Sequence, residues 1–191
     1  HCRDRHRTRG ASGGRRAGKD RLRRNQLTRV YRILRKAYAR SPLDGEGAYR
    51  YGGRWSSAGT RLSYTSEHQS LAMLEYFVHL DSDNAPADLV LVTAEIPDDL
   101  SRERIAGQEL PYYWRKSPAP AELGRIGDEF ARRAKHCILI VSSALAPNEN
   151  NWLLNPQHLS FRRIVLSQLE PLRYDPRMFG RQRGRRRPRN I

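Results

Sequence analysis

The sequence has little cysteine and no long apolar segment. Its 191 residues contain two cysteines, Cys2 and Cys137, which form no zinc motif and are too few for a disulfide scaffold. The longest apolar runs, such as 137–141, have about five residues, whereas a membrane-spanning helix needs about 20. The arginine-rich start has no apolar stretch behind it, so no signal peptide is predicted. We therefore expect a cytoplasmic protein with no membrane association, in which Cys137 is buried and Cys2 is exposed.

Acidic residues are too few to balance the basic ones, and the imbalance is local. The chain has 36 Lys and Arg against 20 Asp and Glu, giving a net charge of +16. Most of this excess lies in 1–26 and 181–191, which are rich in Arg and almost free of apolar residues, a composition typical of disorder. The segment 27–180 is nearly neutral. We therefore predict one folded domain over 27–180, between a basic disordered leader (1–26) and a basic disordered tail (181–191).

Two helices are predicted within this domain. The first covers 66–80, with Ser66 as its N-cap and Gln69 completing a capping box. Its apolar stripe would consist of Leu71, Leu74 and Val78. The second helix is expected over 121–134.

Short β-prone runs separate these helices. Strands are expected over 30–34, 62–65, 89–96, 137–141, 152–154 and 163–169. The segments 41–47 and 98–114 are expected to be irregular. Short strands interspersed with two helices predict an α+β fold.

Glu75 interrupts the apolar stripe of the first helix. It lies four residues after Leu71, where an apolar residue belongs. Burying a carboxylate is costly unless it is paired or used, so Glu75 is a candidate catalytic residue. The alternative is that the helix rotates enough to leave Glu75 in water at the edge of the stripe.

Arg54 and Tyr64 are candidate ligand-binding residues. Arg54 follows Gly52 and Gly53, which allow a backbone to approach a ligand closely, and its planar fork suits a phosphate. Tyr64 ends a short strand, where its ring could stack on a flat ligand. The alternatives are an ordinary loop arginine and a half-buried strand aromatic. Gly-Gly-Arg is neither a dinucleotide fingerprint nor a P-loop.

Polar residues follow two of the later strands. Ser143 comes after the strand over 137–141, and Asn151 and Asn155 frame an apolar triplet. Their side chains could bind a polar ligand, or they could tie turns to the backbone. The helix also contains His68 and His79 near Glu75, but the spacing is not that of a zinc motif, so no metal is predicted.

Taken in order, these segments resemble the RES domain family, which is named for its Arg, Glu and Ser. The resemblance covers nearly all of residues 29–180. It rests on Pro42–Gly47, Gly52–Trp55, Tyr64–Glu67, Leu74–Glu75, Glu95–Pro97, Ser143, Asn151–His158 and Asp175–Phe179.

The resemblance implies a fold, an activity and a partner. The fold would be an ADP-ribosyltransferase-like split β core with flanking helices. RES proteins are toxins encoded beside Xre-type antitoxins, and they deplete NAD⁺ by breaking its nicotinamide–ribose bond with water or phosphate. NAD⁺ would be the substrate, and no cofactor is expected.

The resemblance also assigns roles to the candidate residues. Arg54 would bind the pyrophosphate, Tyr64 would orient the nicotinamide, Glu75 would bind the ribose hydroxyl, and Ser143 would position the substrate or acceptor. Asn151 and Asn155 would shape the NAD⁺ pocket.

Other functions stay open at the level of sequence. Some RES proteins transfer ADP-ribose to a protein, so a mono-ADP-ribosyltransferase is the nearest alternative. The basic segments could bind nucleic acid weakly through phosphates. An inactive partner protein and a homodimer are further alternatives.

Overall fold

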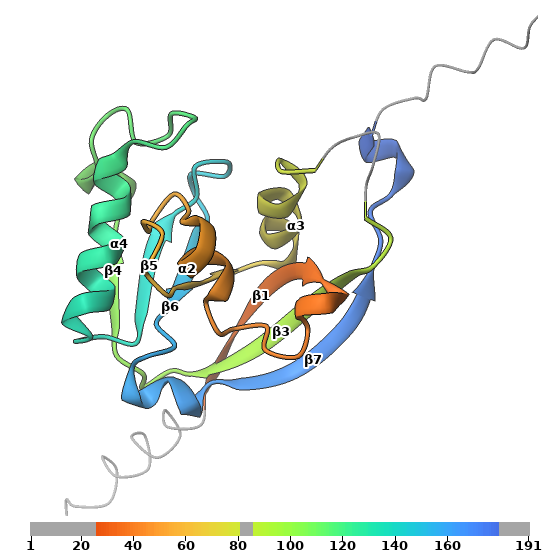
Figure 1. Cartoon of the computed structure of the whole chain (residues 1–191), viewed down its shortest axis with the longest axis horizontal. Helices are drawn as coiled ribbons and strands as arrows, with labels where there is room; N and C mark the ends of the chain where they lie inside the picture. Colours follow the sequence, from red (N-terminus) through yellow and green to blue (C-terminus); the bar gives the residue numbers. More distant parts are fainter. Residues whose placement is uncertain (1–25, 81–85, 180–191) are drawn as a thin grey trace, which may run out of the picture.

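The computed structural model describes residues 26–80 and 86–179. Residues 1–25 of the predicted leader, including Cys2, and the whole predicted tail lie outside the described residues. Within them, no helix has the length and apolar character needed to cross a membrane. Figure 1 shows a curved sheet with helices packed against it.

Seven strands form a mixed sheet in the order β4-β5-β6-β2-β1-β3-β7. Only β4 and β5 are parallel, and every other neighbouring pair is antiparallel. The strands are β1 (Leu27–Arg35), β2 (Ser63–Ser66), β3 (Leu89–Pro97), β4 (Arg102–Ile105), β5 (Ile138–Ser142), β6 (Asn150–Leu154) and β7 (Val165–Leu172).

The helices are short, and several are single 3₁₀ turns. The α-helices are α2 (Glu46–Tyr51), α3 (Gln69–Phe77) and α4 (Ala121–Arg133). The 3₁₀ helices are η1 (Lys36–Tyr38), η2 (Gly107–Glu109), η3 (Leu159–Arg163) and η4 (Pro176–Phe179).

The sheet consists of two halves with little backbone pairing between them. One half contains β4, β5, β6 and β2, and the other contains β1, β3 and β7. A single residue pair, Tyr31 and Ser66, joins them, because the four-residue β2 pairs along its whole length with β6 and reaches β1 only at its end. The α+β fold with a split β core, predicted from the sequence, is confirmed.

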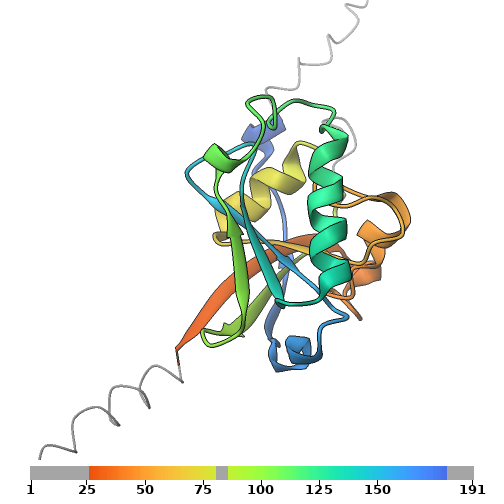
Figure 2. The same ribbon diagram turned by 90° about the vertical axis from the view of Figure 1, so that its left-hand side faces the viewer.

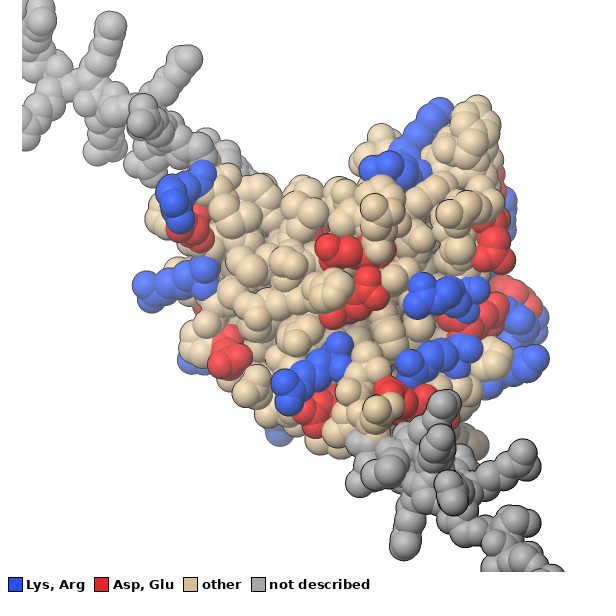
Figure 3. All heavy atoms as spheres, turned by 180° about the vertical axis from the view of Figure 1, so that it is seen from behind, with Lys and Arg blue, Asp and Glu red and all other residues tan. Residues whose placement is uncertain are grey.

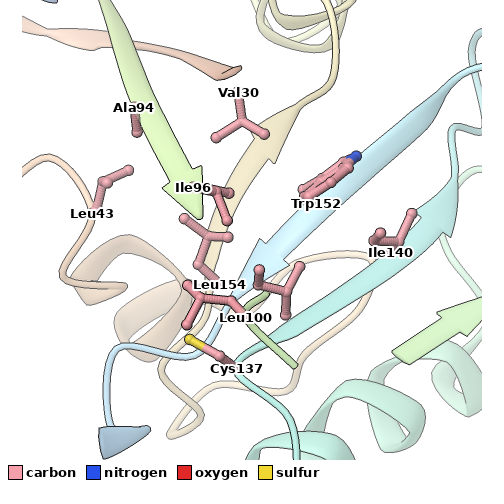
Figure 4. Close-up of a cluster of buried hydrophobic side chains, with 10 residues drawn as sticks. Val30, Leu43, Ala94, Ile96, Leu100, Cys137, Ile140, Trp152 and Leu154 are labelled. Atoms are coloured by element: carbon pink, nitrogen blue, oxygen red, sulfur yellow. The ribbon is translucent and has the colours of Figure 1, made fainter. Parts of the chain in front are cut away.

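One apolar cluster contains side chains from both halves of the sheet. It includes Val30 of β1, Ile96 of β3, Ile140 of β5 and Trp152 of β6, whose side chains converge in Figure 4. Cys137 is fully buried in this cluster, as predicted. Burying side chains from both halves holds the sheet in its curved form.

The helices α3 and α4 cover the opposite face of the sheet. Leu123 and Phe130 of α4 pack with the β5 and β6 side chains that point away from the central cluster, whereas α3 packs its Ala72 against Ile33 of β1. Successive strand side chains alternate between faces, and Ser66 pairs with both Tyr31 and Asn151. Both helices therefore lie on one face of the sheet, one over each half (Figures 1 and 2).

Most expected strands form, with ends shifted by a few residues. The second helix is confirmed as α4. One α-helix and one strand were missed, since α2 begins within the expected loop at 46 and β4 forms within the segment expected to be irregular. The last expected strand was displaced, because η3 runs to Arg163 and β7 begins only at Val165.

The prediction for the first helix was wrong at its start. Ser66 is the last residue of β2 and not an N-cap, because its backbone continues the pairing with β6. The helix α3 begins at Gln69 after His68, which makes no side-chain capping bond. The predicted stripe was also wrong, since Leu74 and Val78 are exposed and the buried residues are Leu71 and Ala72.

Candidate active site

Four of the predicted residues meet at the joint between the two halves of the sheet. Glu75 lies on α3, Ser143 follows β5, and Asn151 is in β6. Arg54 lies in the turn after α2, and a β-bridge between Gly53 and Ser56 closes this turn. The chain thus brings together residues that are up to 97 positions apart.

Glu75 is held by one of its two oxygens. Its Oε1 accepts a hydrogen bond from Ser143 Oγ at 2.7 Å and another from Asn151 Nδ2 at 2.6 Å. Within residues 26–80 and 86–179, nothing donates a hydrogen bond to Oε2. The carboxylate is therefore fixed in direction, and Oε2 is left to bind a ligand.

Ser143 is a buried residue whose hydroxyl contacts Glu75. It is fully buried, and its Oγ accepts hydrogen bonds from the backbone N–H groups of Leu145 and Ala146, both at 3.1 Å. Since both lone pairs of this oxygen are engaged, its single hydrogen is directed at Glu75. Ser143 thus orients the carboxylate of Glu75, and its predicted role toward a substrate or acceptor stays a prediction.

Arg54 is held by backbone carbonyls. Its Nη1 donates to Trp114 O at 2.7 Å and to Lys116 O at 3.1 Å. Burial lowers the pKa of the guanidinium from its ordinary value, while the charge of Glu75 opposes this shift. Arginine stays protonated in proteins, so Arg54 is a fixed cation close enough to Glu75 for their charges to interact.

Tyr64 supports the turn that contains Arg54. Its hydroxyl accepts from Trp55 N at 3.0 Å and shares a 2.9 Å hydrogen bond with Ser56 Oγ. A Cβ on Gly53 would lie 2.7 Å from this hydroxyl, so Gly53 permits close packing on Tyr64, where the sequence suggested approach to a ligand. Burial raises the pKa of Tyr64, which keeps the hydroxyl neutral and able to make both bonds.

Asn155 does not join the other candidates. It follows the far end of β6, it is fully buried, and its amide donates to Ala131 O at 3.3 Å. Its Oδ1 accepts from Gln157 N at 3.0 Å. Because both ends of the amide bind the protein's own backbone, Asn155 holds the turn after β6 against α4, and its role in shaping a ligand pocket stays a prediction.

Sequence reasoning missed the groups that hold the candidate site residues in position. The carbonyls of Trp114 and Lys116 give no sequence signal, because every residue has one. Asn151 was predicted to contact a ligand, but its amide binds Glu75. Within the described residues, no group of three or more His, Cys, Asp or Glu side chains is placed to hold a metal ion.

Comparison with known proteins adds a family to this geometry. The model of the RES domain matches residues 29–175, which is most of the chain. This chain belongs to the RES domain family. A protein named Toxin Res from Yersinia enterocolitica is 40% identical over 151 residues, covering 78% of this chain and 98% of that protein. The Prs ADP-ribosylating toxin of a Sphingobium species is 35% identical over 155 residues, covering 79% and 96%.

A solved structure has a similar fold. It is a chain of the M. tuberculosis MbcT–MbcA toxin–antitoxin complex, with a TM-score of 0.64 over 81% of this chain and 87% of that one. The sequences are 18% identical, so the likeness concerns the fold. It supports the assignment of this RES domain to the same α+β architecture.

Proposed function

We propose that this RES domain is the toxin of a toxin–antitoxin pair and that it degrades NAD⁺ by cleaving the nicotinamide–ribose bond. The observation that supports this best is the arrangement of Glu75. Two donors fix its Oε1, and the fixed cation of Arg54 lies near enough to interact with its charge. An oriented carboxylate beside an arginine suits a dinucleotide that has a cationic ring at one end and a pyrophosphate in its middle.

The reaction requires charge stabilisation more than proton transfer. As the bond between ribose C1′ and the nicotinamide nitrogen breaks, its electron pair goes to the nitrogen and neutral nicotinamide leaves. The ribose becomes oxocarbenium-like, as in glycoside hydrolysis. An acceptor oxygen from water or phosphate then bonds to C1′ and releases its proton. A preorganised carboxylate stabilises the positive charge that develops in the transition state.

Each residue has a part in this scheme. Glu75 would bind a ribose hydroxyl through Oε2 and stabilise the sugar cation. Arg54 has donors left on its fork beyond the two bonds of Nη1, and these would bind the pyrophosphate. Ser143 and Asn151 would fix the direction of Glu75. Tyr64 would position Arg54 by supporting its turn, with its ring available to the nicotinamide end.

The partner that we propose is a cognate antitoxin of the Xre type. The relatives from Yersinia enterocolitica and Sphingobium are named as toxins, and the structural neighbour was solved as a toxin–antitoxin complex. NAD⁺ would be the substrate, and the scheme calls for no cofactor.

The test is to incubate the purified chain with NAD⁺, with and without phosphate, and to quantify nicotinamide and the ADP-ribose product by chromatography. We expect nicotinamide release. The product would identify the acceptor, being ADP-ribose for water and its 1″-phosphate for phosphate. Folded protein without antitoxin that releases no nicotinamide would contradict the proposal.

Glu75→Gln is the decisive variant. The amide oxygen of Gln still accepts hydrogen bonds from Ser143 and Asn151, so the shape is kept while the negative charge is lost. We expect kcat to fall by about 10²–10³-fold, the size typical of losing one preorganised electrostatic group. Glu170→Gln, which changes an exposed carboxylate on β7, is the matched control and should turn over at the rate of the unmodified protein. Full NAD⁺ loss with Glu75→Gln would rule out the role of this carboxylate.

A protein acceptor is the second candidate. It is favoured by the Sphingobium relative, which is named as an ADP-ribosylating toxin and aligns over most of both chains. NAD⁺ labelled in its adenine, incubated with cell extract, separates the two activities. Label bound to protein would indicate a mono-ADP-ribosyltransferase, whereas label in small molecules would indicate NAD⁺ degradation.

A further inference from the structure

A second buried hydroxyl lies directly behind the candidate active site. Ser66 is 3% exposed, and its Oγ donates a hydrogen bond to Asn151 Oδ1 at 2.8 Å. The backbone of Ser66 is paired on both sides, with Asn151 across β2–β6 and with Tyr31 across β1–β2. The hydroxyl is therefore held where β1 and β2 pair, at the joint between the two halves of the sheet.

The carboxamide of Asn151 has only one useful orientation. Its Nδ2 donates to Glu75 Oε1 at 2.6 Å, and an ionised carboxylate can only accept hydrogen bonds, so the nitrogen must face Glu75. The carbonyl oxygen then faces inward, where it is almost fully buried and needs a donor. Ser66 is that donor.

The three groups form a chain of hydrogen bonds that all point the same way. The hydroxyl of Ser66 donates to the amide of Asn151, and the amide donates to the carboxylate of Glu75. Hydrogen bonds in such a chain polarise one another. Loss of the first donor would leave a buried carbonyl without a partner and would allow the amide to turn away from Glu75.

We propose that Ser66 is a positioning residue for Glu75, acting through the amide of Asn151. The kinetic effect expected of this role rests on the proposed function, in which Glu75 is the catalytic carboxylate that Ser66 helps to keep in place. Ser143, which follows β5, donates to the same oxygen, so Glu75 is held by Asn151 of β6 and by the residue after β5.

Thr65 provides a matched control on the same strand. It is also 3% exposed, and its Oγ1 also bonds to β6, donating to Trp152 O at 2.7 Å. It lies on the other face of the sheet and has no hydrogen bond to Glu75 or Asn151. Thr65→Val therefore removes an equally buried hydroxyl hydrogen bond between two strands, and it leaves the hydrogen bonds from Ser66 to Asn151 and from Asn151 to Glu75 unchanged.

The kinetic test compares Ser66→Ala, Ser66→Cys and Thr65→Val. Cys keeps nearly the shape of Ser but is a weak donor. We expect kcat for NAD⁺ cleavage to fall about tenfold or more in both Ser66 variants, since small displacements of a catalytic group are costly, with KM changed less than twofold. Thr65→Val should lower Tm and leave kcat unchanged. Unchanged kcat in Ser66→Ala, or an equal loss in Thr65→Val, would overturn the proposal.

A double-mutant cycle tests whether Ser66 acts on Glu75 through Asn151. If Ser66 acts only through Asn151, adding Ser66→Ala to Asn151→Ala should lower kcat no further, because the intermediate group is already gone. An additional loss in the double variant equal to that in Ser66→Ala alone would show that Ser66 acts by another route, and the proposal would be wrong.

An NMR measurement tests the chain of donors without any enzymatic activity. In ¹⁵N-labelled protein, the Nδ2 protons of Asn151 should exchange slowly with solvent, and their exchange should become at least tenfold faster in Ser66→Ala but stay the same in Thr65→Val. Unchanged exchange in Ser66→Ala would overturn the positioning role. Absence of NAD⁺ cleavage in the unmodified protein would contradict the proposed function alone.

Discussion

Arg54 shows how a single side chain depends on the backbone around it. Two carbonyls of the segment between η2 and α4 occupy its Nη1, and within the described residues the other two nitrogens of the fork make no hydrogen bond. A lysine retains the charge but has no planar fork, and one ammonium group cannot bind both carbonyls and a pyrophosphate in the same geometry.

We therefore expect Arg54→Lys to raise the KM for NAD⁺ about tenfold or more and to lower kcat. Initial rates over a range of NAD⁺ concentrations measure both constants. Arg50→Lys is the control, because Arg50 is an exposed arginine on α2 that pairs with Glu46. Kinetic constants for Arg54→Lys that equal those of the unmodified protein would exclude a role for the fork.

Tyr64 acts on the same turn through its hydroxyl. In Tyr64→Phe the N–H of Trp55 would lose its partner, and a buried group left without a hydrogen bond costs about 1–3 kcal/mol. We expect the free energy of unfolding to fall by that amount in urea titrations, and the KM for NAD⁺ to rise because the Arg54 turn loosens.

Tyr49→Phe is the control for this prediction. Tyr49 is exposed, and its ring would remain under the guanidinium of Arg61 after the change. A Tyr64→Phe protein as stable as Tyr49→Phe would show that the hydroxyl of Tyr64 is not needed to hold the turn.

At the scale of elements, α4 depends on two glycines within it, Gly124 and Gly127. Both are buried on the face that packs on the turn after α2. A Cβ on Gly127 would lie 1.6 Å from Trp55 O, whereas one on Gly124 would lie 3.4 Å from Ser57 Oγ. Gly127 is thus the point of closest approach between α4 and the turn that contains Arg54.

Gly127→Ala should therefore destabilise the protein by about 3 kcal/mol, at the upper end of the cost of overpacking. Gly124→Ala should change stability by less than about 1 kcal/mol, because its Cβ fits and alanine favours a helix. Denaturant unfolding of the two variants measures the difference. Equal stabilities would contradict the close packing of α4 on Trp55.

At the scale of the whole molecule, Tyr174 ties the C-terminal segment to α3. Its hydroxyl donates to Met73 O at 2.6 Å, and its ring packs on Phe77. Burial raises the pKa of Tyr174 to about 12, and burial raises the pKa of Cys137 to about 11. Both groups are therefore neutral in the folded protein over a range of pH where the unfolded chain is ionised.

The raised pKa values of Tyr174 and Cys137 determine how the stability of the protein should change with pH. Above pH 9 to 10 the unfolded chain binds fewer protons than the folded protein, so the free energy of unfolding should fall as pH rises from about 9 to 12. Tyr174→Phe should be about 1 kcal/mol less stable at pH 7 through the lost hydrogen bond and should show a shallower fall between pH 10 and 12. Urea titrations at several pH values measure this.

Tyr112→Phe is the control for the pH effect, because this ring is 94% exposed. Its free energy of unfolding should depend on pH in the same way as that of the unmodified protein. If the free energy of unfolding fell as steeply with pH in Tyr174→Phe as in Tyr112→Phe, ionisation of Tyr174 would not be the cause of the loss of stability at high pH.

Side chains of both charge signs lie on the face of the molecule seen in Figure 3. Among the described residues, many opposite charges form ion pairs, such as Arg163 with Asp99 and Arg133 with Glu103. The net positive charge of the chain comes mainly from 1–26 and 181–191, most of which lies outside the described residues. A role for those segments in binding nucleic acid therefore stays a prediction.

The sequence alone determined the family, the α+β class, most of the strands and the helix α4. Periodicity and β-propensity report local geometry, and an ordered string of motifs is specific even where each motif is weak. The same reasoning selected Arg54, Glu75, Ser143 and Asn151, because polar residues at unusual positions in apolar patterns can be recognised one at a time.

Only the tertiary structure decided what these residues do to one another. Ser66 was expected to cap a helix, but pairing with β6 keeps it in a strand, where it donates to Asn151. Asn155 resembles Asn151 in sequence, yet it lies at the other end of β6 and binds only the protein's own backbone. The direction of a hydrogen bond depends on which groups from distant segments meet, and local sequence patterns do not contain that information.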